Sequence, residues 1–310
     1  MNKQPVVLIA GSGNVTGMNV IQGLIEKGIT VIGCDFQKDN PANMLCENLV
    51  VPKADDSAYP DVMSKNIRER NVTHIIPSND HDLRRLMLMG DMLHSQGIRL
   101  NGYGSNTLGW LNKDTTQNLF KTYGIRTPST VSNDRDYPYI LRKKIMGDNR
   151  KFVYAVKCDA DRNEIPAEAF LTGIKTRYIE GNEYTIDVVC NDNSVPLAVV
   201  PRLRIEVRNG MVHHARIVKD DELIAQIKHI CEELHLKGIN CLQCIRNRND
   251  DEFYFIEINP RPGSGIDLSI KGGINMPYLW IQSTLGNACN VPEPEWGLNM
   301  LRYFNGYFYH

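Results

Sequence analysis

The first hundred residues alternate between short apolar runs and segments whose apolar residues recur at helical spacing. Residues 5–10 form an apolar run that ends in Gly-Ser-Gly, helical spacing follows to Ile25, and residues 29–33 are apolar again. A further unit of this kind has a strand-like run at 72–77 and helical spacing over 83–93. This alternation predicts a parallel sheet with helices on both faces, a Rossmann-like α/β domain over residues 1–110.

The pattern changes after residue 110. A helix is predicted over 113–123, and residues 140–192 alternate in the manner of antiparallel strands. An amphipathic helix is predicted over 221–236 with Gly238 as its stop, and a strand over 252–258. The fold class is therefore α/β, with an N-terminal Rossmann-like parallel sheet followed by an α+β domain over 111–310.

Composition narrows the class of protein. The 310 residues suit two domains, and the 35 Lys and Arg against 36 Asp and Glu, without a basic run, argue against a nucleic-acid partner. No stretch approaches the ~18 apolar residues that a membrane helix needs, so we expect no membrane partner. The eight cysteines show no disulfide spacing, which favours reduced thiols and a cytoplasmic location. Cys241 and Cys244 lack the second pair that a zinc site requires, so buried strand cysteines are the preferred interpretation.

The glycine-rich turn after the first strand has two interpretations. Gly11, Gly13 and Gly17 lie between a strand and a helix, where backbone N–H groups can hold a phosphate. Asp35 closes the second strand, where an NAD ribose would be held, so an NAD-dependent oxidoreductase is one hypothesis. The alternative, which we favour, is that the glycines only permit a tight turn and close packing.

A second constellation lies far downstream and combines Gln243 with Glu257, Asn259 and Arg261. Residues two apart on a strand point to the same face, so Glu257 and Asn259 project together. One carboxylate and two amide oxygens suit Mg²⁺, and the guanidinium suits a phosphoryl group in transfer. The alternative is a solvated face of an edge strand followed by a polar turn.

The order of several motifs resembles that of a known superfamily. Residues 257–261 read EINPR, Gln243 precedes them, and NKD at 112–114, GIRTP at 124–128, PYILR at 138–142 and YIEGNEYTID at 178–187 come before both. Together they resemble ATP-grasp enzymes over residues 5–285, most closely the carbamoyl-phosphate synthetase large-subunit type. The resemblance implies a pre-ATP-grasp domain at 1–110 and one ATP-grasp unit at 111–310. That unit would comprise subdomains at 111–175 and 176–290 and a tail at 291–310.

The resemblance also implies roles for individual residues. Lys113 and Arg142 would contact the phosphates, the backbone at Tyr178 and Ile179 would bind adenine, and Glu183 would bind the ribose hydroxyls. Gln243, Glu257 and Asn259 would bind one or two Mg²⁺ ions, or Mn²⁺ in their place. Arg261, with Arg142, is the catalytic cation that neutralises the transferred phosphoryl group.

The activity that the resemblance implies is an ADP-forming ligase. ATP would phosphorylate a small-molecule carboxylate, and an amine or thiol would displace phosphate from the acyl phosphate. The chain has one ATP-grasp unit where the synthetase large subunit has two, so we do not expect carbamoyl phosphate synthesis. The segment 143–151 keeps only Gly147 of a glycine-rich flap, and Thr176-Arg177 replaces the usual Gln-Glu hinge. A catalytically silent ATP-binding protein is therefore a further alternative, beside the NAD-dependent oxidoreductase.

Two further regions concern substrates and assembly. Arg202 and Arg204 share one face of a predicted strand and are candidates for binding the acceptor's carboxylate or phosphate, with exposed-face ion pairs as the alternative. The resemblance makes Gly11 and Gly13 acceptor-facing or packing elements. Aromatic residues fill the C-terminal tail, so we expect it to dock on the body of the protein or on a second subunit, as in a homodimer. They are Tyr303, Phe304, Tyr307, Phe308 and Tyr309.

Overall fold

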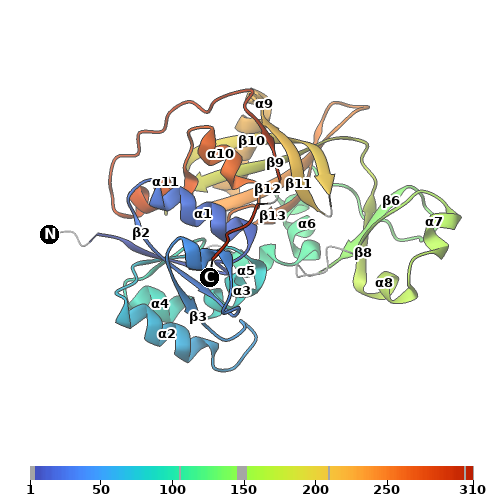
Figure 1. Ribbon diagram of the computed structural model, residues 1–310. Coiled ribbons are helices and arrows are strands. Elements are labelled where there is room, and N and C mark those ends of the chain that lie inside the picture. The colour runs from blue at the N-terminus through green and yellow to red at the C-terminus, as the bar shows by residue number, and fades with distance from the viewer. Residues whose placement is uncertain (1–3, 105, 145–151, 209, 304, 310) are drawn as a thin grey trace.

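The structure is a computed structural model that describes residues 4–104, 106–144, 152–208, 210–303 and 305–309 (Figure 1). It contains one parallel sheet and two antiparallel sheets. The parallel sheet is N-terminal, a small three-stranded sheet forms a projecting lobe, and a six-stranded sheet forms the C-terminal body (Figure 1). The predicted fold class is confirmed.

The N-terminal sheet has the strand order β3-β2-β1-β4-β5. Its strands are β1 (Val6–Ala10), β2 (Thr30–Asp35), β3 (Glu47–Val50), β4 (His74–Pro77) and β5 (Arg99–Leu100). Its helices are α1 (Val15–Ile25), η1 (Pro41–Met44), α2 (Tyr59–Glu69), α3 (Asp80–Leu88) and α4 (Gly90–Ser95). The single helix predicted over 83–93 is therefore wrong, because α3 ends at Leu88 and a second helix, α4, begins at Gly90. A Cβ at Gly90 would lie 2.6 Å from the ring of Tyr103, so this approach requires glycine.

The small lobe follows two helices, α5 (Thr107–Trp110) and α6 (Lys113–Thr122). Its strands are β6 (Tyr139–Lys143), β7 (Val153–Val156) and β8 (Gly173–Arg177), in the order β7-β6-β8, with helices α7 (Asp159–Asn163) and α8 (Ala167–Thr172). The lobe has a small apolar core of its own around Tyr139 and Leu141. Its projection from the body is plain in Figure 1.

The C-terminal sheet has the order β13-β12-β9-β10-β11-β14. The strands are β9 (Gly181–Cys190), β10 (Pro196–Arg208), β11 (Met211–Ile217), β12 (Gly238–Asn247), β13 (Phe253–Asn259) and β14 (Asn299–Leu301). The helices are α9 (Asp221–Glu233), α10 (Ile266–Lys271) and α11 (Met276–Thr284). Helix α9 ends at Glu233, before the predicted residue 236; His235 follows at φ 51°, and Gly238, which begins β12, is at φ 66°.

The core joins the N-terminal sheet to the C-terminal body. One apolar cluster contains Val7 and Ile9 of β1, Ile21 of α1 and Val200 of β10, together with residues of α10 and α11. A separate cluster packs α9 against the opposite face of the C-terminal sheet. Because one continuous core spans both sheets, residues from each can form a common site.

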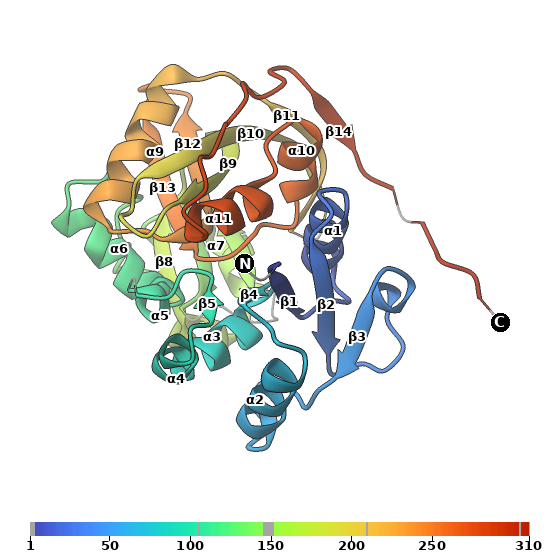
Figure 2. The same cartoon turned by 90° about the vertical axis from the view of Figure 1, so that its left-hand side faces the viewer.

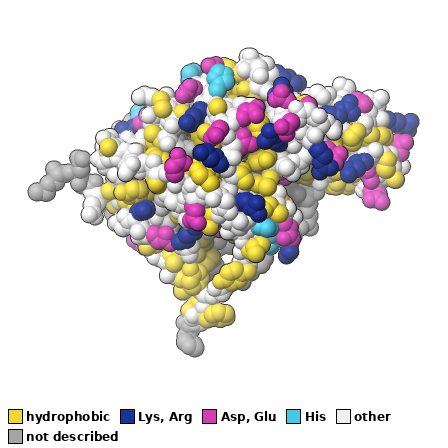
Figure 3. All heavy atoms as spheres, turned by 90° about the horizontal axis from the view of Figure 1, so that it is seen from above, with side chains coloured by type: hydrophobic (Ala, Val, Ile, Leu, Met, Phe, Trp, Pro, Cys, Tyr) yellow, Lys and Arg dark blue, Asp and Glu magenta, His cyan; other side chains and the backbone are white. Residues whose placement is uncertain are grey.

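The C-terminal tail packs on the body of its own chain up to Arg302 and leaves it at Tyr303. Trp296 and Met300 pack against the apolar core, β14 pairs with β11, and Arg302 pairs with Asp267. The described residues from Tyr303 onward run away from the body (Figures 2 and 3). The side chain of Tyr303 is 77% exposed and that of Phe308 is 95% exposed. The expectation of docking on the body is therefore wrong for these residues, and docking on a second subunit stays a prediction. Phe304 lies outside the described residues.

None of the described helices is long and apolar enough to cross a membrane.

Candidate active site

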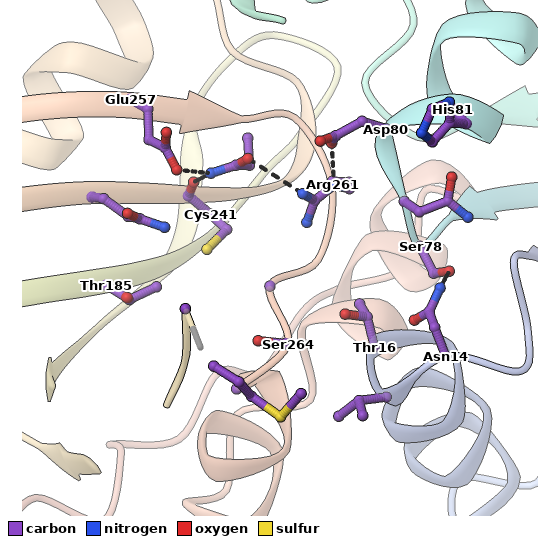
Figure 4. A pocket seen from close by; sticks show the side chains of 18 of the residues that line it. Asn14, Thr16, Ser78, Asp80, His81, Thr185, Cys241, Glu257, Arg261 and Ser264 are labelled. Atoms are coloured by element: carbon purple, nitrogen blue, oxygen red, sulfur yellow. Dashed lines mark hydrogen bonds and ion pairs between the residues drawn. The ribbon is translucent and has the colours of Figure 1, made fainter. Parts of the chain in front are cut away.

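A cavity of about 1260 Å³ is lined by residues of the N-terminal sheet, the small lobe and the C-terminal body (Figure 4). Every site residue that the sequence suggested lines it. These are Gly11, Gly13, Lys113, Arg142, Tyr178, Ile179, Glu183, Arg202, Arg204, Gln243, Glu257, Asn259 and Arg261. The fold thus brings together residues that lie up to 250 positions apart in sequence, from Gly11 to Arg261.

Glu257 lies between two cations. Strand β13 places it opposite Gln243 of β12, 3.4 Å from Lys113 Nζ and 4.0 Å from Arg142 Nη1. Burial would raise the pKa of Glu257, but Lys113 and Arg142 outweigh burial and lower the pKa to about 2. Although β13 is an edge strand, the Glu257 side chain is only 16% exposed. The alternative of a solvated strand face is therefore wrong.

The residues around Glu257 suit a magnesium ion by their chemistry. An ionised carboxylate and the amides of Gln243 and Asn259 are oxygen donors of the kind that Mg²⁺ prefers, and this ion usually keeps positions for water and phosphate. Asn259 Nδ2 donates to Glu257 Oε1 at 3.1 Å, so ligation by Asn259 Oδ1 on that side requires rotation of the amide. Among the described residues there is no cluster of three or more His, Cys, Asp and Glu side chains that could hold a metal.

The two cations near Glu257 come from the region of the small lobe. Arg142 is buried on β6; its Nη2 donates to the Ile256 carbonyl at 3.2 Å, and its Nε is buried without a partner among the described residues. Lys113 begins α6, and its backbone N–H donates to the Lys144 carbonyl. An arginine with an unused buried donor is suited to bind an anion, as predicted for Arg142. Of the predicted flap at 143–151, residues 145–151 lie outside the described part.

The predicted nucleotide hinge connects β8 and β9. The Tyr178 N–H donates to the Pro138 carbonyl, so this group is not open to adenine. The Ile179 N–H makes no backbone bond among the described residues. Glu183 faces Arg204, whose Nε lies 3.2 Å from Glu183 Oε1. Burial raises the pKa of Glu183, while Arg204 opposes this effect.

Arg202 and Arg204 both line the cavity, but their surroundings differ. Arg202 and its partner Asp187 are each 1% exposed, with Nη2 and Oδ1 2.8 Å apart, and Ser269 Oγ donates to Asp187 Oδ2 at 2.6 Å. The alternative of exposed-face ion pairs is therefore wrong for Arg202. Cys241 lies nearby, and burial raises the pKa of its thiol to about 12, so it is a poor nucleophile.

The N–H groups of the glycine-rich turn are already hydrogen-bonded within the protein. Those of Gly11 and Ser12 donate to the Cys34 carbonyl, and that of Gly13 donates to Asp35 Oδ2. Asp35 Oδ1 accepts from the Gln37 N–H, so both carboxylate oxygens of Asp35 are engaged. Gly11 has φ 75°, and a Cβ there would meet the side chain of Ser78 at 2.7 Å. These contacts favour the tight-turn interpretation and disfavour an NAD phosphate at this position.

Sequence reasoning missed Asp80. This residue begins α3 just beyond β4, and its Oδ1 accepts from Arg261 Nε at 2.6 Å (Figure 4). The available signal was its position, because ligands of α/β sheets bind beyond the carboxyl ends of strands, and Asn79, Asp80 and Asp82 follow β4 directly. That signal locates an edge of the sheet but does not identify a partner.

Comparisons with known proteins agree with this architecture. Residues 170–303 match a family model described as "ATP-grasp in the biosynthetic pathway with Ter operon". No curated protein matches the sequence significantly. A solved N5-carboxyaminoimidazole synthetase from Staphylococcus aureus, complexed with ADP, has a TM-score of 0.75 at 17% identity, covering 94% of this chain and 80% of that one.

Two other solved structures are similar over most of the chain. The biotin carboxylase domain dimer of the Hydrogenobacter thermophilus 2-oxoglutarate carboxylase, with MgADP and bicarbonate, has a TM-score of 0.70 at 14% identity, covering 94% of this chain and 72% of that one. The L-amino acid ligase from Bacillus licheniformis has a TM-score of 0.70 at 16% identity, covering 92% of this chain and 75% of that one. The match to an ATP-grasp family model thus covers residues 170–303, and these solved structures show that most of the chain shares their fold.

Proposed function

We propose that the protein is an ATP- and Mg²⁺-dependent ligase that joins a small-molecule carboxylate to an amine or thiol and forms ADP. The observation that carries this proposal is the arrangement around Glu257, where an ionised carboxylate, two flanking cations and a third cation at Arg261 line one cavity. Such a set suits a metal-bound triphosphate, because phosphoryl transfer depends mainly on positioning and charge neutralisation.

The proposed roles are those that the resemblance to ATP-grasp enzymes implies, and the positions of the side chains around one cavity support them. Glu257 and the amides of Gln243 and Asn259 would hold one or two Mg²⁺ ions, which when bound neutralise phosphate charge. Lys113 and Arg142 bind the phosphates from the side of the small lobe. The adenine lies against the Tyr178–Ile179 backbone, where the Ile179 N–H is the donor because the Tyr178 N–H is bound to the Pro138 carbonyl, and Glu183 accepts from the ribose hydroxyls. In this proposal Arg261 neutralises the phosphoryl group as it passes to the carboxylate.

The acceptor end of the cavity is proposed to lie between the C-terminal sheet and the glycine-rich turn. Arg202 and Arg204 face it from β10, and Gly11 and Gly13 face it from the N-terminal domain. Because Asp187 already accepts from Nη2 of Arg202, this arginine binds an acceptor carboxylate through Nε and Nη1. Among the solved neighbours, the L-amino acid ligase is named for joining amino acids, and the biotin carboxylase domain holds bicarbonate.

Glu257→Gln tests the proposal. The substitution keeps the shape of the side chain but removes the charge that binds metal, so ADP and phosphate release against a panel of carboxylates and amines should fall to background. Glu252→Gln is the matched control, because Glu252 immediately precedes the same strand, lies outside the cavity and forms an exposed ion pair with Arg126. Retained ATP-dependent ligation in Glu257→Gln would sink the assignment.

Thermal shift separates this proposal from the two alternatives. Stabilisation by ATP with Mg²⁺ and none by NAD is expected for the ligase. A silent ATP-binding protein would show the same shift without ADP formation with any acceptor pair.

The domain boundary at residue 110 and a homodimer formed through the tail are also proposed. Light scattering that compares the molar mass of wild type with that of a chain ending at residue 302 tests the homodimer.

A further inference from the structure

The side chain of Arg261 is held by a residue of the N-terminal domain. Asp80 Oδ1 lies 2.6 Å from Arg261 Nε, and the two side chains are only 16% and 18% exposed. The other guanidinium nitrogens make weaker contacts, from Nη1 to the Pro262 carbonyl at 3.1 Å and from Nη2 to Asn259 Oδ1 at 3.4 Å. The shortest contact of this guanidinium thus crosses from one domain to the other (Figure 4).

The backbone around Arg261 is held from the same side. Asn101 is fully buried, and its Nδ2 donates to the Pro260 carbonyl at 3.4 Å and to the Ile239 carbonyl at 3.1 Å. Its Oδ1 accepts from the Ile239 N–H at 2.7 Å, so the orientation of the amide is fixed. Asn19 of α1 donates to the Ser264 carbonyl at 3.2 Å. Three elements of the N-terminal domain therefore hold the segment that follows β13.

Asp80 is itself well placed for this task. It begins α3, where the helix dipole favours a negative charge, and Asn79 caps the same helix by accepting from the Asp82 N–H. An arginine guanidinium is always protonated in a protein, so Asp80 faces a full positive charge at Arg261. A charge-assisted hydrogen bond between two fixed groups defines the direction in which Nη1 and Nη2 point.

We propose that Asp80 is a positioning residue, which orients Arg261 for phosphoryl transfer and makes the N-terminal domain part of the transfer centre. This inference rests on the proposed function of Arg261. Asp80 acts through the guanidinium and not on the nucleotide, so its loss should lower kcat while leaving KM for ATP nearly unchanged. Asn101 supports the same segment through its backbone.

The experiment compares Asp80→Asn and Asp80→Ala with Glu26→Gln. Glu26 and Lys271 also form a 2.6 Å ion pair between the two domains, but both side chains are more than half exposed and lie outside the cavity. Steady-state phosphate release should show kcat reduced about 10- to 100-fold in Asp80→Asn, the range typical of residues that orient a functional side chain. KM for ATP should change less than about twofold, and Glu26→Gln should match wild type.

A second measurement does not depend on turnover. In protein labelled with ¹⁵N-arginine, the Arg261 Nε–H signal, assigned with Arg261→Lys, should shift and exchange faster with water in both Asp80 variants but not in Glu26→Gln. An unchanged signal, a wild-type kcat in Asp80→Asn, or a rise in KM for ATP with unchanged kcat would each overturn the inference. If wild type releases no ADP with any substrate, the proposed function fails, while the Arg261 signal still decides whether Asp80 orients the guanidinium.

Discussion

Replacement of Glu257 by glutamine should destabilise the protein as well as inactivate it. The pKa of Glu257 is about 2 in the folded chain and 4.5 is its ordinary value, because Lys113 and Arg142 overcome the effect of burial. A difference of ~2.5 pKa units at ~1.4 kcal/mol per unit gives ~3 kcal/mol of stability at pH 7. The side chain is 16% exposed, so solvent screening reduces this value little.

The sign of the pH dependence follows from the direction of the shift. Because folding lowers the pKa, the carboxylate stabilises the fold fully above pH 4.5, and this stabilisation is lost as the pH falls toward 2. Glutamine does not titrate, so the difference between wild type and Glu257→Gln should narrow on acidification. At pH 4 it should be smaller by about 1 kcal/mol than at pH 7.

Urea unfolding of both proteins, without Mg²⁺ or nucleotide, measures these differences. The midpoint should fall while the slope of the unfolding free energy with urea stays constant. Glu252→Gln removes a carboxylate that is 41% exposed and paired with Arg126, so its cost should stay below about 1 kcal/mol. A loss below 1 kcal/mol for Glu257→Gln at pH 7, or a difference that does not change by pH 4, would refute the electrostatic reasoning.

Two other predictions concern buried charges. Arg202→Met should lower the free energy of unfolding, measured in urea, by about 3–5 kcal/mol because it leaves Asp187 buried and unpaired. The double variant Arg202→Met, Asp187→Leu should recover most of this loss. Equal losses in the single and double variants would contradict the prediction. His74 is 2% exposed, and burial, with a smaller effect of Arg99, lowers its pKa to about 4 from 6.5. Because the unfolded chain binds this proton more readily, the contribution of His74 to the free energy of unfolding should fall by about 2 kcal/mol from pH 7.5 to 5. Urea unfolding of His74→Gln at the two pH values should lack this contribution.

Local patterns were enough to predict most of the fold. The first strand, the glycine-rich turn and α1 follow from short-range periodicity, and so do α9 and β13 apart from their ends. The division of 83–93 into two helices falls beside Gly90, against which the ring of Tyr103 packs from outside the helical segment. A contact of this kind leaves no mark in the local spacing of apolar residues.

The candidate site was predictable where order along the chain carried the signal. Lys113, Arg142 and Glu257 were each suggested by motifs, and the structure places Lys113 Nζ 3.4 Å and Arg142 Nη1 4.0 Å from the Glu257 carboxylate. Asp80 was missed because its partner, Arg261, lies 181 residues further along the chain, after β13. A single aspartate after a strand has many local explanations, and only the packing of two domains selects Arg261 as the partner of Asp80.

The proposed cations of the site are each paired with a carboxylate of the chain, with which a bound phosphate has to compete. Lys113 and Arg142 face Glu257, Arg261 faces Asp80, and Arg204 faces Glu183. Unpaired cations buried together would repel one another and lose hydration, so this pairing makes the cluster compatible with a folded chain. Under the proposed function, ATP phosphates would compete with Glu257 for Lys113 and Arg142, and the Glu257 carboxylate released from these cations would hold Mg²⁺. Metal and nucleotide should therefore bind with positive coupling, since each one compensates the charge that the other leaves unpaired.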